Sequence, residues 1–127
     1  MKHVKDMVAE ANAKIHCVTG AEAKEMLGRE DVQFVDLRDI RELQREGMVP
    51  GAFHCPRGML EFWVDPESPY AKPVFQEDKT FVFYCASGWR SALSTLTMQD
   101  MGLPKVAHIS DGFTGWVKAD GEVAAKE

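Results

Sequence analysis

The sequence contains only three cysteines among its 127 residues, at positions 17, 55 and 85. An odd number of widely spaced cysteines does not make the disulfide framework that stabilises many small secreted domains. We therefore expect the thiols to be reduced and the protein to be cytoplasmic.

Long apolar segments and an excess of positive charge are also missing. The apolar runs extend for only a few residues, so none is long enough to cross a bilayer. The first fourteen residues carry charges throughout and lack the apolar centre of a secretory signal peptide. The formal net charge of −5 gives no general attraction to nucleic acid or to an anionic membrane. We therefore expect neither nucleic acid nor a membrane as a partner.

The composition that remains is that of a globular domain. Hydrophobic residues make up 45% and charged residues 28% of the chain, both ordinary values, and 127 residues can bury a substantial core. No repeat, low-complexity segment or linker divides the chain. We expect an amphipathic N-terminal helix over residues 1–14, a single domain over 15–121 and a tail over 122–127.

Helical and extended patterns alternate along the chain. Extended segments are predicted at 16–18, 32–36, 51–54, 80–84 and 106–109. Helices are predicted at 4–15, 19–28, 39–47, 91–101 and 112–119, with one helical turn at 59–63. Strands separated by helices indicate an α/β fold with a central, mainly parallel sheet of about five strands and helices on both faces.

Local signals support two of these helix starts and one buried face. Thr19 is followed by Glu22, and Asp39 by Glu42, at the spacing of a capping box. In the helix predicted at 91–101, the residues expected to face inward are Ala92, Leu93, Leu96 and Met101.

The segment TFVFYCASGWRSALSTL, Thr80–Leu96, places Cys85 at the carboxyl end of the most apolar predicted strand. In open α/β folds the functional site lies beyond the carboxyl ends of the strands. The loop after Cys85 has small residues and a glycine, so its backbone can curl and direct N–H groups at the sulfur. The following helix start and Arg90 add positive charge, which favours the thiolate. Cys85 is therefore predicted to be a nucleophile carrying an anionic adduct, the alternative being a buried structural cysteine.

Four short motifs occur along this pattern of strands and helices. They are V-D-L-R at Val35–Arg38, G-M-V-P-G-A at Gly47–Ala52, F-Y-C-A-S-G-W-R-S at Phe83–Ser91 and D-G-F-T-G-W at Asp111–Trp116. With these motifs in this order, the chain resembles a single-domain rhodanese over roughly residues 17–118. Two positions depart from the family pattern: Met48 replaces a usual histidine, and Asp111 replaces the first of two usual glycines.

The resemblance implies a rhodanese-like three-layer domain and a sulfurtransferase without a cofactor. Cys85 would attack the outer sulfur of a donor such as thiosulfate, and the resulting persulfide would pass its sulfur to cyanide or a thiol. A protein persulfide is a further conceivable partner, and the N-terminal helix could mediate a homodimer. The residues implied to bind the sulfur donor are Ala86, Ser87, Gly88, Trp89, Arg90 and Arg57.

Three other functions share the scaffold. Rhodanese-like phosphatases and some arsenate reductases have a cysteine loop one residue longer, with five residues between cysteine and arginine, which encircles a tetrahedral oxyanion. Here four residues separate Cys85 from Arg90, which favours sulfur transfer. Non-catalytic rhodanese modules that bind a partner often lack the cysteine, which this chain retains.

The remaining candidates have ordinary structural alternatives. Asp36, Arg38 and Glu42 are expected to form structural ion pairs, as the V-D-L-R region does in the family, rather than to line the site. Arg57 could hold an anionic sulfur donor or be a surface arginine, and Trp89 could be a pocket wall or a hydrophobic plug. No metal is expected, because in His16-Cys17 and His54-Cys55 adjacent strand residues point to opposite faces.

Overall fold

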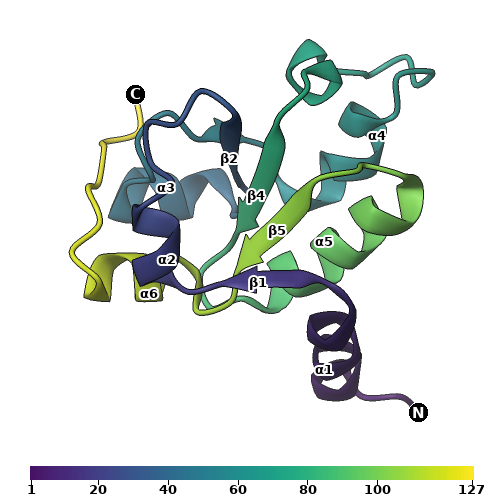
Figure 1. Cartoon of the computed structure of the whole chain (residues 1–127), viewed down its shortest axis with the longest axis horizontal. Helices are drawn as coiled ribbons and strands as arrows, with labels where there is room; N and C mark the ends of the chain where they lie inside the picture. The colour runs from purple at the N-terminus through teal and green to yellow at the C-terminus, as the bar shows by residue number, and fades with distance from the viewer.

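The computed structural model describes all 127 residues and contains a five-stranded sheet in the order β1-β5-β4-β2-β3 (Figure 1). The strands are β1 His16–Val18, β2 Val32–Asp36, β3 Phe53–His54, β4 Thr80–Tyr84 and β5 Val106–Ile109. Every pairing between neighbours is parallel, so the predicted α/β fold with a parallel sheet is confirmed. The third strand is shorter than predicted, because Gly51 adopts a φ of 76° in the turn that precedes Phe53.

Six α-helices and two short 3₁₀ helices surround the sheet. They are α1 Val4–Lys14, α2 Gly20–Lys24, α3 Ile40–Glu46, η1 Arg57–Met59, α4 Leu60–Val64, η2 Pro73–Gln76, α5 Trp89–Met101 and α6 Gly112–Lys118. Both predicted capping boxes are present, at the starts of α2 and α3. Helix α5 begins at Trp89 rather than at Ser91, because the left-handed Gly88 lets the chain turn directly into the helix.

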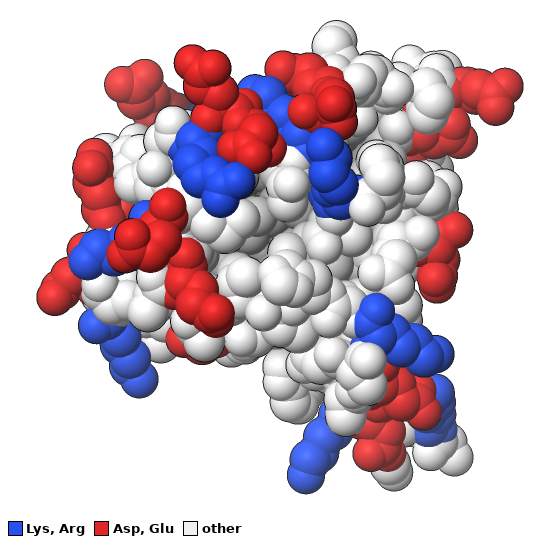
Figure 2. Space-filling model, in the orientation of Figure 1, with Lys and Arg blue, Asp and Glu red and all other residues white.

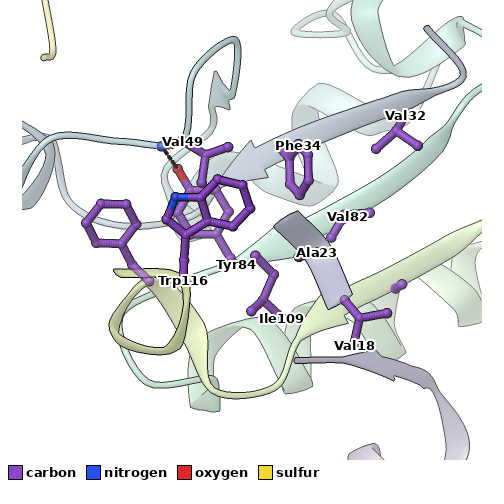
Figure 3. Close-up of a cluster of buried hydrophobic side chains, with 11 residues drawn as sticks. Val18, Ala23, Val32, Phe34, Val49, Val82, Tyr84, Ile109 and Trp116 are labelled. Atoms are coloured by element: carbon purple, nitrogen blue, oxygen red, sulfur yellow. Dashed lines mark hydrogen bonds between the residues drawn. The ribbon is translucent and has the colours of Figure 1, made fainter. Parts of the chain in front are cut away.

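One face of the sheet is closed by α2 and α6 over an apolar cluster (Figure 3). The strand residues that point to it alternate along each strand, as a parallel sheet buried on both faces requires. The fully buried Trp116 of α6 packs edge-on against Phe34 of β2, with ring centroids 5.7 Å apart. The hydroxyl of Tyr84 accepts a hydrogen bond of 3.1 Å from the Val49 amide, shown dashed in Figure 3. The cluster comprises Val18, Ala23, Val32, Phe34, Val49, Val82, Tyr84, Ala107, Ile109, Phe113 and Trp116.

The other face is covered by α4, α5 and η2, and α1 packs against α5. Val35, Phe81 and Phe83 point to this side and meet Met98 of α5. Helix α1 places Val8 and Ala11 against Ala92 of α5, with Leu93 and Leu96 alongside. In Figure 1, α1 lies below β1 and the start of α5.

The prediction that Met101 faces inward is wrong. Its side chain is 43% exposed, because α5 ends there and Gly102 turns the chain away in a left-handed conformation.

Three parallel strands end side by side at the edge that carries the site. Asp36 at the end of β2 lies in register with Tyr84 of β4 and with His54 of β3. Cys55 and Cys85 therefore follow two strands that flank β2. The first of the two departures from the family pattern, Met48, forms an antiparallel bridge with Ala124 near the C-terminus.

Two observations concern the surface and length of the elements. On the face drawn in Figure 2, Lys and Arg side chains are interspersed with Asp and Glu rather than gathered in one basic area. None of the helices combines the length and the apolar character needed to cross a membrane.

Candidate active site

Cys85 follows β4 directly and is fully buried. Its Sγ accepts hydrogen bonds from the backbone N–H of Gly88 at 3.2 Å and of Ser91 at 3.4 Å. The Ser91 hydroxyl lies 3.6 Å from the same sulfur. Two amides at the start of α5 therefore point at the sulfur, and amides in this arrangement stabilise a negative charge that forms on it.

The backbone of this loop requires glycine at position 88. Gly88 has a φ of 102°, which side chains rarely adopt. A Cβ atom at this position would also collide with the carbonyl group of Ser110 after β5. The loop can therefore curl round the sulfur only because residue 88 lacks a side chain.

The D-G-F-T-G-W motif supports the cysteine loop through backbone hydrogen bonds. The amide of Phe113 donates to the Cys85 carbonyl at 2.8 Å, and that of Thr114 to the Ala86 carbonyl at 3.2 Å. A Cβ on Gly112 would clash with Ala86, so helix α6 can approach the loop this closely only with glycine there. Asp111 is the second departure from the family pattern. Its carboxylate accepts a hydrogen bond of 2.8 Å from the Gly20 amide, which links the start of α6 to the start of α2.

Arg90 forms a two-pronged ion pair with Glu42 of α3, with N–O distances of 2.8 and 3.1 Å. Glu42 also accepts the Asp39 amide as part of its capping box. The guanidinium holds the pKa of Glu42 below its usual range, and Glu42, with the nearby Cys85 sulfur, raises the pKa of Arg90. Glu42 therefore forms an ion pair, as expected, and its partner is the arginine of the cysteine loop.

Asp36 and Arg38 form the expected structural ion pair. Both side chains are completely buried, with a shortest N–O distance of 2.8 Å. Arg38 also donates to the Gly47 carbonyl at 2.7 Å and lies 4.3 Å from the centre of the Phe113 ring. The pair anchors the second motif to the first and makes no hydrogen bond to Cys85. Because each charge depends on the other, removing one partner would cost about 3–5 kcal/mol of stability.

The other predicted residues are less closely linked to the sulfur. Arg57 pairs with Glu61 at 2.8 Å, one helical turn further on, and makes no hydrogen bond to the loop. Trp89 is 48% exposed at the first position of α5, which excludes the role of a buried plug. Ala86 and Ser87 form the outer turn of the loop, where Ser87 is exposed.

Two residues near the sulfur, Ser91 and His108, are not predicted as site residues by the sequence motifs. The Ser91 hydroxyl lies 2.8 Å from Nδ1 of His108 on β5, and Nε2 of His108 lies 2.8 Å from Oδ1 of Asn12 on α1. The imidazole is fully buried, and burial lowers its pKa to about 4. A histidine within the apolar strand Val106–Ile109 was the available signal, because a buried polar side chain needs partners.

The potential metal-binding side chains do not gather into a cluster. No group of three or more His, Cys, Asp or Glu side chains converges as a ligand set. Cys17 lies 3.5 Å from Nε2 of His108, its register partner on the neighbouring strand, rather than against the adjacent His16.

Known proteins with named activities match most of the chain at low identity. The thiosulfate sulfurtransferase GlpE of Glaesserella parasuis is 28% identical over 103 residues, covering 81% of this chain and 87% of its own. A mouse protein described as thiosulfate sulfurtransferase/rhodanese-like domain-containing protein 3 is 27% identical over 105 residues, which cover 79% of this chain. The match spans 67% of the mouse protein's length.

A solved structure is much more similar. It is a protein of unknown function from Rhodopseudomonas palustris, described as a possible tyrosine phosphatase, with 56% identity and a TM-score of 0.94. The similarity covers 98% of this chain and 96% of that one. The family model of the rhodanese-like domain matches residues 19–119, which hold the cysteine loop and the sheet that carries it. The chain therefore belongs to the rhodanese-like domain family.

Proposed function

We propose that the protein is a sulfurtransferase that carries sulfane sulfur on Cys85. The observation that supports this most directly is the pair of N–H groups from Gly88 and Ser91 on the buried sulfur. They offer stabilisation to an anionic sulfur without a metal or a protonated base. The sulfurtransferase relatives agree with this chemistry.

The reaction proceeds by two displacements at sulfur. The Cys85 thiolate attacks the outer sulfur of thiosulfate, a bond forms between the two sulfurs, and the broken S–S bond releases its electron pair with sulfite. Cyanide then attacks the outer sulfur of the persulfide and leaves as thiocyanate. The electron pair of the second broken bond returns to Cys85 as thiolate. The loop amides hold the negative charge before and after each step.

Arg90 is suited to attract an anionic sulfur donor. Its side chain is 41% exposed while Glu42 holds it in place, so the charge is both positioned and accessible. The persulfide of a small thiol or of a protein could replace thiosulfate as the physiological sulfur donor, because the attacked group is the same sulfane sulfur.

The direct test is intact-mass spectrometry after incubation with thiosulfate and removal of excess reagent. We expect one added sulfur atom on the wild-type protein and on Cys55→Ser, and none on Cys85→Ser. Adding cyanide should remove that atom and release thiocyanate. A wild-type protein that never gains sulfur from thiosulfate, polysulfide or glutathione persulfide would contradict the proposal.

A phosphatase activity is the second candidate, favoured by the description of the Rhodopseudomonas palustris protein as a possible tyrosine phosphatase. The loop argues against it, because only four residues separate Cys85 from Arg90, one fewer than in the loops that encircle a tetrahedral oxyanion. Incubation with p-nitrophenyl phosphate should show no turnover above that of Cys85→Ser. Turnover that depends on Cys85 would place phosphatase activity first.

A further inference from the structure

A chain of polar side chains leads from Cys85 to the N-terminal helix. The Cys85 sulfur lies 3.6 Å from Ser91 Oγ, which lies 2.8 Å from His108 Nδ1. On the other side of the imidazole, Nε2 lies 2.8 Å from Asn12 Oδ1. Ser91 and His108 are fully buried, so water does not compete for the contacts that join Cys85, Ser91 and His108, whereas Asn12 lies at the exposed end of the chain of side chains. Asn12 lies on α1, before the region that the family model matches.

The direction of the hydrogen bonds follows from Asn12. A carbonyl oxygen can only accept, so Nε2 of His108 must carry the proton that it donates to Asn12 Oδ1. The thiol of Cys17 also faces this oxygen, at 3.5 Å. A neutral imidazole with its proton on Nε2 has only a lone pair on Nδ1. The Ser91 hydroxyl must therefore donate to His108 and turn its own lone pairs toward Cys85.

The imidazole remains neutral in this position because nothing nearby favours its charged form. The titratable group that faces it is Cys17 of β1, while α1 contributes Asn12 and α5 contributes Ser91. Burial accordingly lowers the pKa of His108 to about 4. On the Cys85 side the charged neighbour is Arg90, itself paired with Glu42.

We infer that His108 and Asn12 are positioning residues for Cys85, which act by withholding the Ser91 hydroxyl proton from the sulfur anion. A Ser91 hydroxyl that accepts a hydrogen bond can pair with the Cys85 thiol. The Cys85 thiolate would instead be stabilised by a third hydrogen-bond donor beside the two backbone amides. The N-terminal helix is thereby part of the active site and tunes the nucleophile. This inference rests on the proposed function only in giving Cys85 its role, since the tuning itself can be measured without sulfur transfer.

The test is the pH dependence of Cys85 alkylation by iodoacetamide, followed on the Cys85 peptide by mass spectrometry in the full-length protein. In His108→Leu the Ser91 hydroxyl is free to donate to the thiolate. We expect the midpoint pH of alkylation to fall by about one unit, the usual effect of one hydrogen bond to a charged group. Asn12→Leu should shift the midpoint in the same direction, because Cys17 can then donate to Nε2 and the imidazole proton can move to Nδ1.

Two further variants separate this mechanism from a general loosening of the site. In the background of Ser91→Ala, His108→Leu should no longer move the midpoint, because the hydroxyl is gone. In the background of His108→Leu, Asn12→Leu should add nothing, since the two act through one path.

The matched controls leave the chain of hydrogen bonds intact. Thr95→Val removes a buried hydroxyl of α5 that has no partner, and Val8→Ala loosens the packing of α1 on α5. Both should keep the wild-type midpoint.

A midpoint that is unchanged or higher in folded His108→Leu would overturn the inference, since a higher value would make His108 a proton acceptor for Cys85. If His108→Leu does not fold, Asn12→Leu decides by the same criterion. A lowered midpoint in a protein that transfers no sulfur would leave this inference standing and reject the proposed function alone.

Discussion

Cys55 and Cys85 occupy equivalent places in the sheet, yet only one of them is equipped for chemistry. Each follows the last residue of a parallel strand, β3 or β4, and each is fully buried. The Cys85 sulfur accepts two amide hydrogen bonds. The Cys55 sulfur has the Pro56 carbonyl at 3.8 Å as its polar neighbour, and burial raises the pKa of this thiol to about 12.

The difference arises in the residues that follow each cysteine. Proline at position 56 has no N–H to offer, and the chain continues into the short 3₁₀ helix η1. After Cys85 the left-handed Gly88 reverses the chain, so that amides at the start of α5 face back to the sulfur. Both cysteines share a strand end and burial, and only the curled loop gives a sulfur the amide donors that the proposed nucleophile needs.

The strongest test of this comparison exchanges each sulfur for oxygen. Cys85→Ser should abolish sulfur transfer from thiosulfate to cyanide, because a serine hydroxyl forms no persulfide, while the melting temperature stays near that of the wild type. Cys55→Ser and Cys17→Ser should keep most of the activity in the same thiocyanate assay. A large loss in either would reveal a second thiol that takes part in the reaction.

The next test disturbs only the loop. Gly88→Ala forces a side chain into a left-handed position against the Ser110 carbonyl, which should move the amides off the sulfur. We expect kcat for thiosulfate to fall about 100-fold, as when a preorganised donor is removed from an anion site. Gly58→Ala after Cys55 is the matched control, because a Cβ there meets no atom within 4 Å. Equal rates in the two variants would show that the loop geometry is unimportant.

A third test uses the buried imidazole that is linked to Cys85 and has no equivalent at Cys55. The pKa of His108 is about 4 in the folded protein against 6.5 for an unperturbed histidine. As pH falls below 6.5, His108 of the unfolded chain binds a proton, whereas the buried imidazole of the folded protein stays neutral. The free energy of unfolding therefore decreases between pH 6.5 and about 4. The loss should amount to about 3 kcal/mol.

Urea denaturation at pH 7 and pH 4.5 measures this contribution. His108→Leu should lose less stability than the wild type over the same interval, whatever its stability at pH 7. An identical loss in both proteins would mean that the imidazole accepts a proton in the folded state.

The smallest expected effect concerns the two arginines near the strand ends. Arg90→Ala should raise KM for thiosulfate roughly tenfold, with a smaller change for a neutral sulfur donor, because the lost attraction is electrostatic. Added salt should weaken thiosulfate binding to the wild type for the same reason. Arg57→Ala, which breaks the half-buried pair with Glu61, should change KM little. A lower melting temperature with an unchanged KM in Arg90→Ala would show that Arg90 stabilises the fold and does not attract the sulfur donor.

Much of the site depends on contacts between segments that no local pattern connects. Glu42 has a local role in its capping box, and that role was predictable, but its pairing with Arg90 joins α3 to α5. Ser91 was placed in a helix without a function, since the carboxyl end of β5 had to be docked beside α5 before His108 could reach it.

The sequence by itself determined the order of strands and helices, the capping boxes, the position of Cys85 at a strand end and the need for a flexible residue after it. These depend on periodicity and on interactions within a few residues, which are independent of the remainder of the fold. Only the tertiary structure decided which amides face the sulfur, which carboxylate holds Arg90, and that Asn12 reaches Cys85 through His108 and Ser91. Those contacts exist because the parallel sheet brings α1, β5 and the start of α5 together, and close packing then leaves the buried Ser91 and His108 a single set of partners.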